Sequence, residues 1–557
     1  MSTSAPGDSG WRPPRPGVLL ATGLLAASLL DRVGWARLAQ WREDQATNLW
    51  LGFTRGPLDL PVGLVSSVGL PNPNGMPLLG VALSRLPGLC AVSWTLGAIQ
   101  AALVVALCFS LSLGLVERVA LSMVLLSSVL LRAASVEFWN QWLLTTLDLA
   151  FAVTVVRYLR RPTLAWLPAW TLLAVAAPAI YLAGVVNAVV FAGVAVLLLL
   201  VHPPGSTPVV RAAAIGGSVL VAGASAVVTW IPYAGAVGLA GVAAASDVAL
   251  STRLHGAGWA VLLSPSWWPF SWVGPGSFVI LQSSPEVLSP LAGTARSWTE
   301  TLLVVQYAVL LAAVAGAAWR WRALRTDSRV DGMGLARRQV AWIASIPSAA
   351  YVVAPLLGGP VLALGERMDM ALQWFPLLLV VWFAGPAVLP LPPGAGRWLR
   401  GAGLAVALLL TGASLTLGRA VQDSYLGYRG PVLVPADVPL SDKVAVVDLI
   451  ASDWRTRGGE ASVPVDYDLG GGAWDWVPSF GRRLETWYPA PMTLGRAFDY
   501  EFLRRHGLSN AQEGAERAPP GGGRYVVSYL ALPPPPTPGR EARHVPVGRL
   551  RVTIVDR

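Results

Sequence analysis

Two adjacent carboxylates near the start of the chain have the type and spacing that proton-transfer chemistry needs. Glu43 and Asp44 come shortly after the first apolar stretch, 17–30, in the motif Trp41-Arg-Glu-Asp-Gln-Ala-Thr-Asn48. A carboxylate can take the proton of an attacking hydroxyl group and so act as a general base. We expect Asp44 to be this base and Glu43 to orient it. The simpler alternative is a solvated helix end.

A third acid, Glu137, lies in the segment Glu137-Phe-Trp-Asn140-Gln141 between two predicted helices. It is interpreted as a further acidic member of the same site, and the alternative is an ordinary loop acid. Asp148 lies inside the next apolar run, where an ionisable side chain has a functional role or a polar partner. Thr145 and Thr146 are the neighbours that can supply a polar helix contact.

The elements that position these acids are predicted to be membrane spans. The chain has 557 residues, of which 54% are hydrophobic and 13% are charged, whereas a soluble protein has about 25% charged residues. Apolar runs of spanning length recur to about residue 418. We expect eleven spans, near 17–30, 91–114, 119–134, 141–157, 164–182, 184–201, 211–232, 301–319, 339–358, 372–390 and 402–418. The first is taken as a retained helix, not a signal peptide, because no small-x-small cleavage site follows it.

The net charge of +10 reflects arginines in the short breaks between apolar runs. This placement is typical of cytoplasmic loops in membrane proteins, and it argues against nucleic acid as a partner. It puts the N-terminus in the cytoplasm and, with an odd number of spans, the C-terminus outside. The outer loops then cover about 33–85 and 233–298. The predicted cytoplasmic arginines include Arg118, Arg157, Arg160, Arg161, Arg211, the cluster at 320–338, Arg397 and Arg400.

The tail, 420–557, is charged and rich in glycine and proline, and it is predicted to be a soluble extracytoplasmic α/β domain beside a membrane domain over 1–419. Ser441 is expected to cap a helix that ends at Gly458-Gly459. One face of that helix carries Val444, Val447, Ile450 and Trp454. The expected strands cover 463–467, 525–530 and 550–555, and a second helix covers 496–505.

A turn-rich loop separates the acid pair from the next span. It reads Gly63-Leu-Val-Ser-Ser-Val-Gly-Leu-Pro-Asn-Pro-Asn-Gly-Met-Pro-Leu79. It is too polar to span a membrane and too rich in glycine and proline to continue a helix. Polar backbone at that depth must line a cavity or pack under protein.

These features together resemble the GT-C membrane glycosyltransferases, close to the branch of protein O-mannosyltransferases and aminoarabinose transferases. A basic-flanked helix precedes an acid pair and a Gly-x-x-Ser-Ser-x-Gly-x-x-Asn-Pro loop, and a helix hairpin then presents Glu137 on the outside. The resemblance is most specific over about residues 1–162. Topology extends it to about 420.

The resemblance implies an enzyme of the cytoplasmic (inner) membrane of a bacterium. It would move a sugar from a polyprenyl-phosphate donor to an unknown glycan, lipid or protein acceptor on the outer face. The catalytic residues that it implies are Asp44, Glu43 and Glu137, and the order of the first two leaves their roles exchangeable. The implied substrate-binding residues are Asn48, Arg55, Ser66, Ser67, Asn72, Asn140, Arg253, His255, Trp267, Trp268 and Arg296. A divalent metal ion on the carboxylates is the one cofactor that it allows.

Two other classes of function compete with this interpretation. A secondary transporter or flippase also has many spans, but the long loops here are asymmetric and a soluble domain is appended. The second class is a catalytically silent GT-C scaffold that binds a lipid-linked glycan. It is suggested by the loop, which has Asn72-Pro73-Asn74 where the family often has His-Pro-Pro. The aromatics Trp267 and Trp268 suit either the headgroup belt of a membrane or a lid over a sugar.

Overall fold

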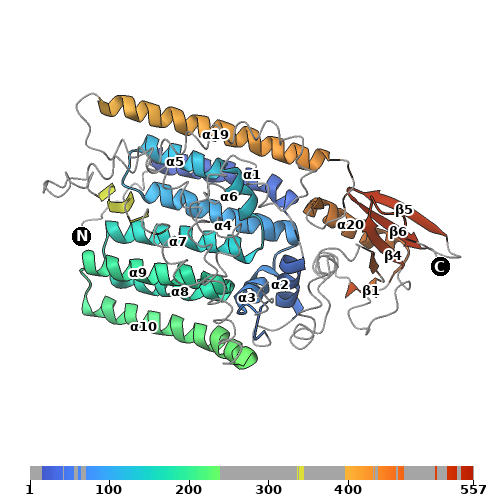
Figure 1. Cartoon of the computed structure of the whole chain (residues 1–557), viewed down its shortest axis with the longest axis horizontal. Coiled ribbons are helices and arrows are strands. Elements are labelled where there is room, and N and C mark those ends of the chain that lie inside the picture. The colour runs from blue at the N-terminus through green and yellow to red at the C-terminus, as the bar shows by residue number, and fades with distance from the viewer. Residues whose placement is uncertain are drawn as a thin grey trace, which may run out of the picture.

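The computed structural model is mostly helical, with a small β-sheet near the C-terminus (Figure 1). It describes residues 16–39, 41, 43–54, 60–63, 71–238, 395–428, 430, 432, 437–459, 462–463, 465–468, 509–510, 524–535 and 541–555, with several helical residues between 335 and 346. The helices before residue 140 are α1 (Pro16–Leu38), α2 (Glu43–Thr54), α3 (Gly75–Leu83), α4 (Leu89–Ser110), α5 (Leu115–Ser127) and α6 (Val129–Ser135). The later helices are α7 (Asn140–Arg160), α8 (Leu167–Ile180), α9 (Val185–Val201), α10 (Pro208–Ser225), α19 (Ala395–Gly427) and α20 (Leu440–Thr456).

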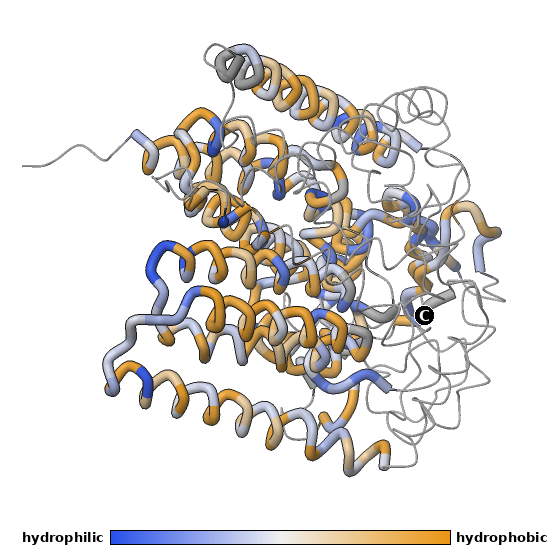
Figure 2. Tube along the Cα trace, turned by 60° about the vertical axis from the view of Figure 1, so that its left-hand side comes forward, coloured by the Kyte–Doolittle hydropathy of each residue, from blue (hydrophilic) through white to orange (hydrophobic). Residues whose placement is uncertain are grey.

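Five described helices are long and apolar enough to cross a membrane. They cover Pro16–Leu38, Leu89–Ser110, Trp142–Arg160, Pro208–Gly238 and Gly401–Gly427. Two shorter apolar helices, Leu164–Ile180 and Val185–Val201, lie beside them. The hydrophobic residues run along the lengths of these helices (Figure 2). The chain is therefore a helical membrane protein, and the spans expected at 301–319 and 372–390 lie outside the described residues.

Local sequence explains where several of these helices begin. The Thr207 hydroxyl accepts a hydrogen bond from the Val210 amide, and Pro208 occupies the first turn of α10, where its missing N–H costs nothing. At the other end α10 widens into a π-helical turn, Ala226–Trp230, before it continues to Gly238. Such turns interrupt an otherwise regular ladder of hydrogen bonds.

The span expected at 119–134 is not one helix in the structure. It breaks at Ser128, where α5 ends and α6 begins. The Ser128 hydroxyl accepts a hydrogen bond from the Leu131 amide and so caps α6. The break places the buried Arg132 of α6 against Asp31 of α1, a charged contact that a continuous apolar span would not need.

The first predicted outer loop contains two helices, and one of them, α3, begins inside the stretch where the glycine and proline content had argued against a helix. α2 begins at Glu43, and α3 begins at Gly75, inside the turn-rich stretch. The two helices cross closely, because a side chain on Gly80 would come within 2.8 Å of the Asn48 carbonyl oxygen. A side chain on Gly52 would likewise meet the backbone of Pro77. The glycines are thus required for the crossing and do not break the helices.

The main hydrophobic core lies between α4, α5, α7, α8 and α9. Phe151 of α7 stacks on Phe191 of α9, with ring centroids 4.3 Å apart. A second cluster joins the ends of α1, α2, α4 and α6 to Leu440 of α20. Packing therefore connects the first outer loop both to the helix bundle and to the C-terminal part of the chain.

The C-terminal sheet has four strands in the order β2-β4-β6-β5. These are β2 (Val465–Asp468), β4 (Tyr525–Tyr529), β5 (Ala542–Val547) and β6 (Leu550–Val555). β2 and β4 are parallel, whereas β6 is antiparallel to both of its neighbours. α20 packs against the sheet through Val446, Val447 and Ile450. A separate pair, β1 (Ser462–Val463) and β3 (Ser509–Asn510), is parallel.

Candidate functional site

Trp41 anchors the start of α2, where the acid pair lies. Its side chain is fully buried, and the indole Nε1 donates a hydrogen bond to the Ser93 hydroxyl of α4 at 3.0 Å. Its ring also stacks on Phe138, with centroids 6.2 Å apart. Glu43 and Asp44 are the first two residues of α2, and their side chains lie outside the described residues. A helix N-terminus favours carboxylates, because its free N–H groups carry partial positive charge.

Glu137 occupies the short segment between α6 and α7. The residue is 3% exposed, and the Trp142 indole donates a hydrogen bond to its Oε2 at 3.2 Å. A buried carboxylate is stable only with such partners. Because Phe138 follows Glu137 directly, the stacking of Phe138 on Trp41 places the backbone at Glu137 beside the segment that precedes α2. The structure therefore brings together the two acidic segments that the sequence singled out.

The Asn-Pro-Asn part of the loop is packed under protein. The Asn72 side-chain oxygen accepts a hydrogen bond from the Leu182 amide at 3.2 Å. The Asn74 amide group donates to the carbonyls of Leu60 and Val228, at 2.6 and 2.9 Å. These bonds fasten the loop to the 3-10 turn Leu182–Gly184, which follows α8, and to the π-helical turn at the end of α10. Of the two outcomes expected for polar backbone at this depth, packing under protein is the one observed.

Other expected substrate-binding residues are only partly described. Asn48 is buried in α2, and Asn140 is the half-buried first residue of α7. The remaining ones lie outside the described residues: Arg55, Ser66, Ser67, Arg253, His255, Trp267, Trp268 and Arg296. Within the described part of the chain, no group of three or more His, Cys, Asp or Glu residues could hold a metal ion.

Lys443 is the only lysine of the chain, and its contact with the segment before α2 was not predicted from the sequence. It lies on α20, is 1% exposed, and its Nζ donates to the Trp41 carbonyl oxygen. It occupies a position on the apolar face of α20, between Leu440 and Val447. A lone lysine within an apolar helix face is the signal that would have found it, because a buried lysine needs a specific partner.

A second cation, Arg549, joins the sheet to the end of α19. Its guanidinium lies 4.6 Å from the ring centroid of Tyr425 and donates to the Asp437 carbonyl oxygen. Its backbone amide donates to Asp442 Oδ2 at 3.0 Å. Lys443 and Arg549 thus place positive charge at the junction between the bundle and the C-terminal sheet, close to the start of α2.

Asp148 has its polar partner on another helix. The Asn187 amide group of α9 donates to Asp148 Oδ1 at 2.8 Å, and both residues are buried. The sequence indicated Thr145 and Thr146 as polar neighbours of Asp148 but gave no indication of Asn187. The contact links α7 to α9 inside the bundle, away from the acidic segments.

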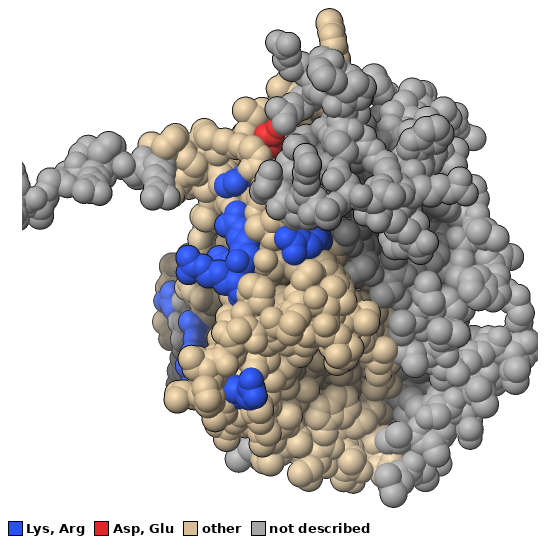
Figure 3. Space-filling view, turned by 90° about the vertical axis from the view of Figure 1, so that its left-hand side faces the viewer, with Lys and Arg blue, Asp and Glu red and all other residues tan. Residues whose placement is uncertain are grey.

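Of the arginines predicted to be cytoplasmic, the described ones Arg118, Arg157, Arg160 and Arg161 lie at the end of the bundle opposite to these acids. Figure 3 shows basic side chains concentrated on that end, and Arg157, Arg160 and Arg161 line one surface hollow there. Arg118 donates from Nε to the Leu113 carbonyl oxygen at 2.8 Å. Burial, with a smaller effect of Arg338, lowers the pKa of His202 at the same end.

Comparison with known proteins gives no family. No family model matches the chain, and neither a curated protein nor a solved structure does. The functional conclusion therefore depends on the residues and their geometry.

Proposed function

We propose that the chain is a membrane glycosyltransferase of the GT-C type, which moves a sugar from a polyprenyl-phosphate donor to an acceptor at the outer membrane face. One observation carries the proposal: the Trp41–Phe138 stacking that joins the acid pair to Glu137. The joined segments lie at the end of the bundle opposite to the arginines. Acids at one surface and arginines at the other suit chemistry outside the cytoplasm.

The reaction needs one base and one cation. The oxygen of the acceptor hydroxyl attacks the anomeric carbon as the bond from that carbon to the phosphate oxygen breaks. Asp44 takes the hydroxyl proton, and Glu43 orients Asp44. The lipid phosphate leaves with the bonding electron pair, and an arginine from the outer loops stabilises its charge. Arg55, Arg253, Arg296 and Arg367 are the candidates for this role.

The proposed topology has eleven spans, with the N-terminus in the cytoplasm of a bacterial cell and the α20–β6 region outside. Support comes from the arginine-bearing end of the bundle and from α19, which leads directly to α20 and the sheet (Figure 1). Protease added to right-side-out membranes should release the segment after about Arg419. Full protection of that segment, with cleavage in inverted membranes, would contradict the topology.

Substitution of the acids tests the proposed chemistry. Transfer is measured in membranes supplied with labelled polyprenyl-phosphate sugars, with protein amount and thermal unfolding measured in parallel. Asp44→Asn should lower transfer by about a hundredfold or more, since general-base contributions are ~10²–10⁴-fold. Glu43→Gln should cost less, and Glu137→Gln should be intermediate. An exchange of the effects at 43 and 44 would exchange the two roles.

Glu117→Gln is the matched control, because Glu117 lies in the first turn of α5 at the arginine-bearing end. It should leave transfer unchanged. Near-normal transfer in the Glu43→Gln, Asp44→Asn double variant would overturn the proposal, because it would show that neither acid of the pair is needed as the general base.

A further inference from the structure

Two buried guanidinium groups inside the bundle share a single carboxylate. Arg32 Nη1 lies 3.0 Å from Asp31 Oδ2, and Arg132 Nη1 lies 3.2 Å from Asp31 Oδ1. The arginine side chains are 1% and 3% exposed, whereas Asp31 is 33% exposed. Among the residues that the structure describes, Asp31 is the one carboxylate that contacts them. Counted over the described residues, the cluster therefore has one net positive charge among membrane-spanning helices, and such a charge is costly without a counter-ion.

The cluster also has hydrogen-bond donors without acceptors. Arg32 Nε, Arg132 Nε and both polar atoms of the Gln100 amide group are buried and have no hydrogen-bond partner among the residues that the structure describes. Gln100 lies one turn along α4 from Gly97, where a side chain would meet Arg32 at 3.2 Å. Buried donors in native proteins are satisfied by protein, water or ligand. Water would accept hydrogen bonds from these donors but would leave the positive charge without a counter-ion. An anion rich in acceptor oxygens would accept the hydrogen bonds and also neutralise the charge.

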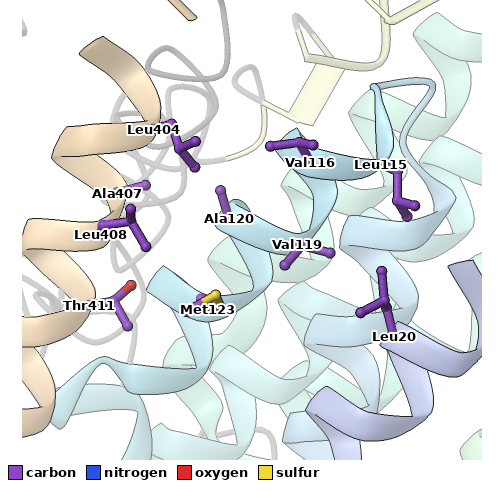
Figure 4. A pocket seen from close by; sticks show the side chains of 10 residues that line it. All are labelled: Leu20, Leu115, Val116, Val119, Ala120, Met123, Leu404, Ala407, Leu408 and Thr411. Carbon is purple, nitrogen blue, oxygen red and sulfur yellow. The ribbon is translucent and has the colours of Figure 1, made fainter. Parts of the chain in front are cut away.

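An apolar groove lies along α19 and ends at Thr411, about one helical turn before the Ser414 carbonyl oxygen that Arg132 contacts. It has a volume of about 360 Å³ and lies between α1, α5 and α19 (Figure 4). Its lining residues are Leu20, Leu115, Val116, Val119, Ala120, Met123, Leu404, Ala407, Leu408 and Thr411. Thr411 lines the groove, and its buried hydroxyl has no hydrogen-bond partner within the described part of the chain.

The groove and the charged cluster follow one another along two parallel helices. One helical turn after Thr411, the Ser414 carbonyl oxygen accepts a hydrogen bond from Arg132 Nη2 at 2.8 Å. On α1, Leu20 lines the groove and Asp31 lies roughly 16 Å further along the helix, at 1.5 Å per residue. A ligand that fits both must be apolar over that length and anionic at the end.

We propose that this surface binds an anionic glycerophospholipid of the bilayer. One acyl chain lies in the groove, and the phosphate accepts hydrogen bonds from Arg32 and Arg132 beside Asp31. The charge complementarity selects an anionic headgroup, and the apolar lining selects a lipid over a free anion. Bound there, the lipid fastens α19 to α1 and α5. The proposal does not depend on the glycosyltransferase activity.

Native mass spectrometry of the full-length, delipidated chain tests the proposal. It is titrated with phosphatidylglycerol and with phosphatidylcholine of the same acyl chains. We expect phosphatidylglycerol to bind at least about tenfold more tightly, because phosphatidylcholine carries the same phosphate together with a choline cation, which the two arginines repel. Arg132→Gln should abolish this preference. Equal binding of the two lipids by the unsubstituted chain would overturn the proposal.

A groove variant keeps the test decisive if Arg132→Gln does not fold. Ala120→Phe fills the groove without changing charge. It should weaken binding of both lipids by about tenfold or more, which corresponds to a loss of ~1.4 kcal/mol or more of contact with the acyl chain. Leu220→Phe on α10 is the matched control, because Leu220 is 75% exposed and outside the groove. Unchanged binding in Ala120→Phe would contradict the groove. Displacement of phosphatidylglycerol by inorganic phosphate would show a soluble-anion site and would also overturn the proposal.

Discussion

The ring of Trp41 stacks on the ring of Phe138 at a centroid distance of 6.2 Å and an interplanar angle of 24°. This contact holds the start of α2 against the segment that contains Glu137. It joins two parts of the chain that the sequence could identify but could not place together. Its loss should therefore affect both stability and the proposed transfer reaction.

Trp41→Ala should lower the free energy of unfolding by about 3–5 kcal/mol, because it removes a fully buried aromatic side chain. Trp41→Phe keeps an aromatic ring but loses the hydrogen bond to Ser93, and it should cost less. Unfolding in mixed detergent micelles measures both variants. Equal stability of Trp41→Ala and the unsubstituted chain would show that the stacking contributes nothing.

Lys443 provides a chemical probe of the junction, since it is the only lysine of the chain. Because it is 1% exposed and bonded to the Trp41 carbonyl oxygen, an amine-reactive acylating reagent should modify it slowly in the folded protein. The denatured protein should react fully, and Trp41→Ala should react at an intermediate rate. Peptide mass spectrometry of Lys443 measures the rates. Rapid modification of the folded chain would contradict the buried contact.

The Asp148–Asn187 hydrogen bond should be measurable as a coupling between α7 and α9. We expect a double-mutant cycle with Asp148→Leu and Asn187→Leu to give a coupling free energy of about 0.6–1.7 kcal/mol, as for other hydrogen bonds between membrane helices. Asp148→Asn should keep most of it. The cycle is followed by unfolding in detergent, and a coupling near zero would show that the 2.8 Å contact does not persist in solution.

Tyr525 should make the C-terminal sheet sensitive to alkaline pH. Burial, together with the hydrogen bond to Asp453, raises the pKa of its hydroxyl above the ordinary value of 10.0. The folded state thus retains the proton that the unfolded state loses above pH 10, so stability is full below that pH and falls as pH rises beyond it. The expected slope is about 1.4 kcal/mol per pH unit for one proton. Tyr525→Phe should remove this slope, whereas a retained slope would assign it to another group.

Apolar periodicity predicted a helix correctly where the burial of one helix face determined the element. The helix expected after Ser441 is α20, Leu440–Thr456, and its buried residues include Val447 and Ile450. Its cap was wrong, because Pro439 occupies the N-cap position and Ser441 lies inside the helix. The strands at 525–530 and 550–555 correspond to β4 and β6. β5 was missed because none of its residues is buried and because it contains Pro546.

Contacts between distant segments could not be predicted from the sequence. Asp31 and Arg32 directly follow the apolar run 17–30, Arg132 lies near the end of the run 119–134, and only the fold shows that the two arginines share Asp31. The helix α3 was missed for a related reason. The glycine and proline content of 63–79 argued against a helix along the chain, whereas α3 begins there at Gly75 and its crossing with α2 makes Gly80 necessary.

The hydrogen bond from Lys443 to Trp41 has a consequence for biosynthesis. Its partners are 402 positions apart in the chain, a distance that a ribosome covers in roughly 20–80 s at 5–20 residues per second. During that time α1 and α2 are already made, but α20 does not yet exist. The acid-bearing turn therefore acquires this contact only near the end of translation, so an unfinished chain in the membrane lacks one of the contacts that hold its first outer loop.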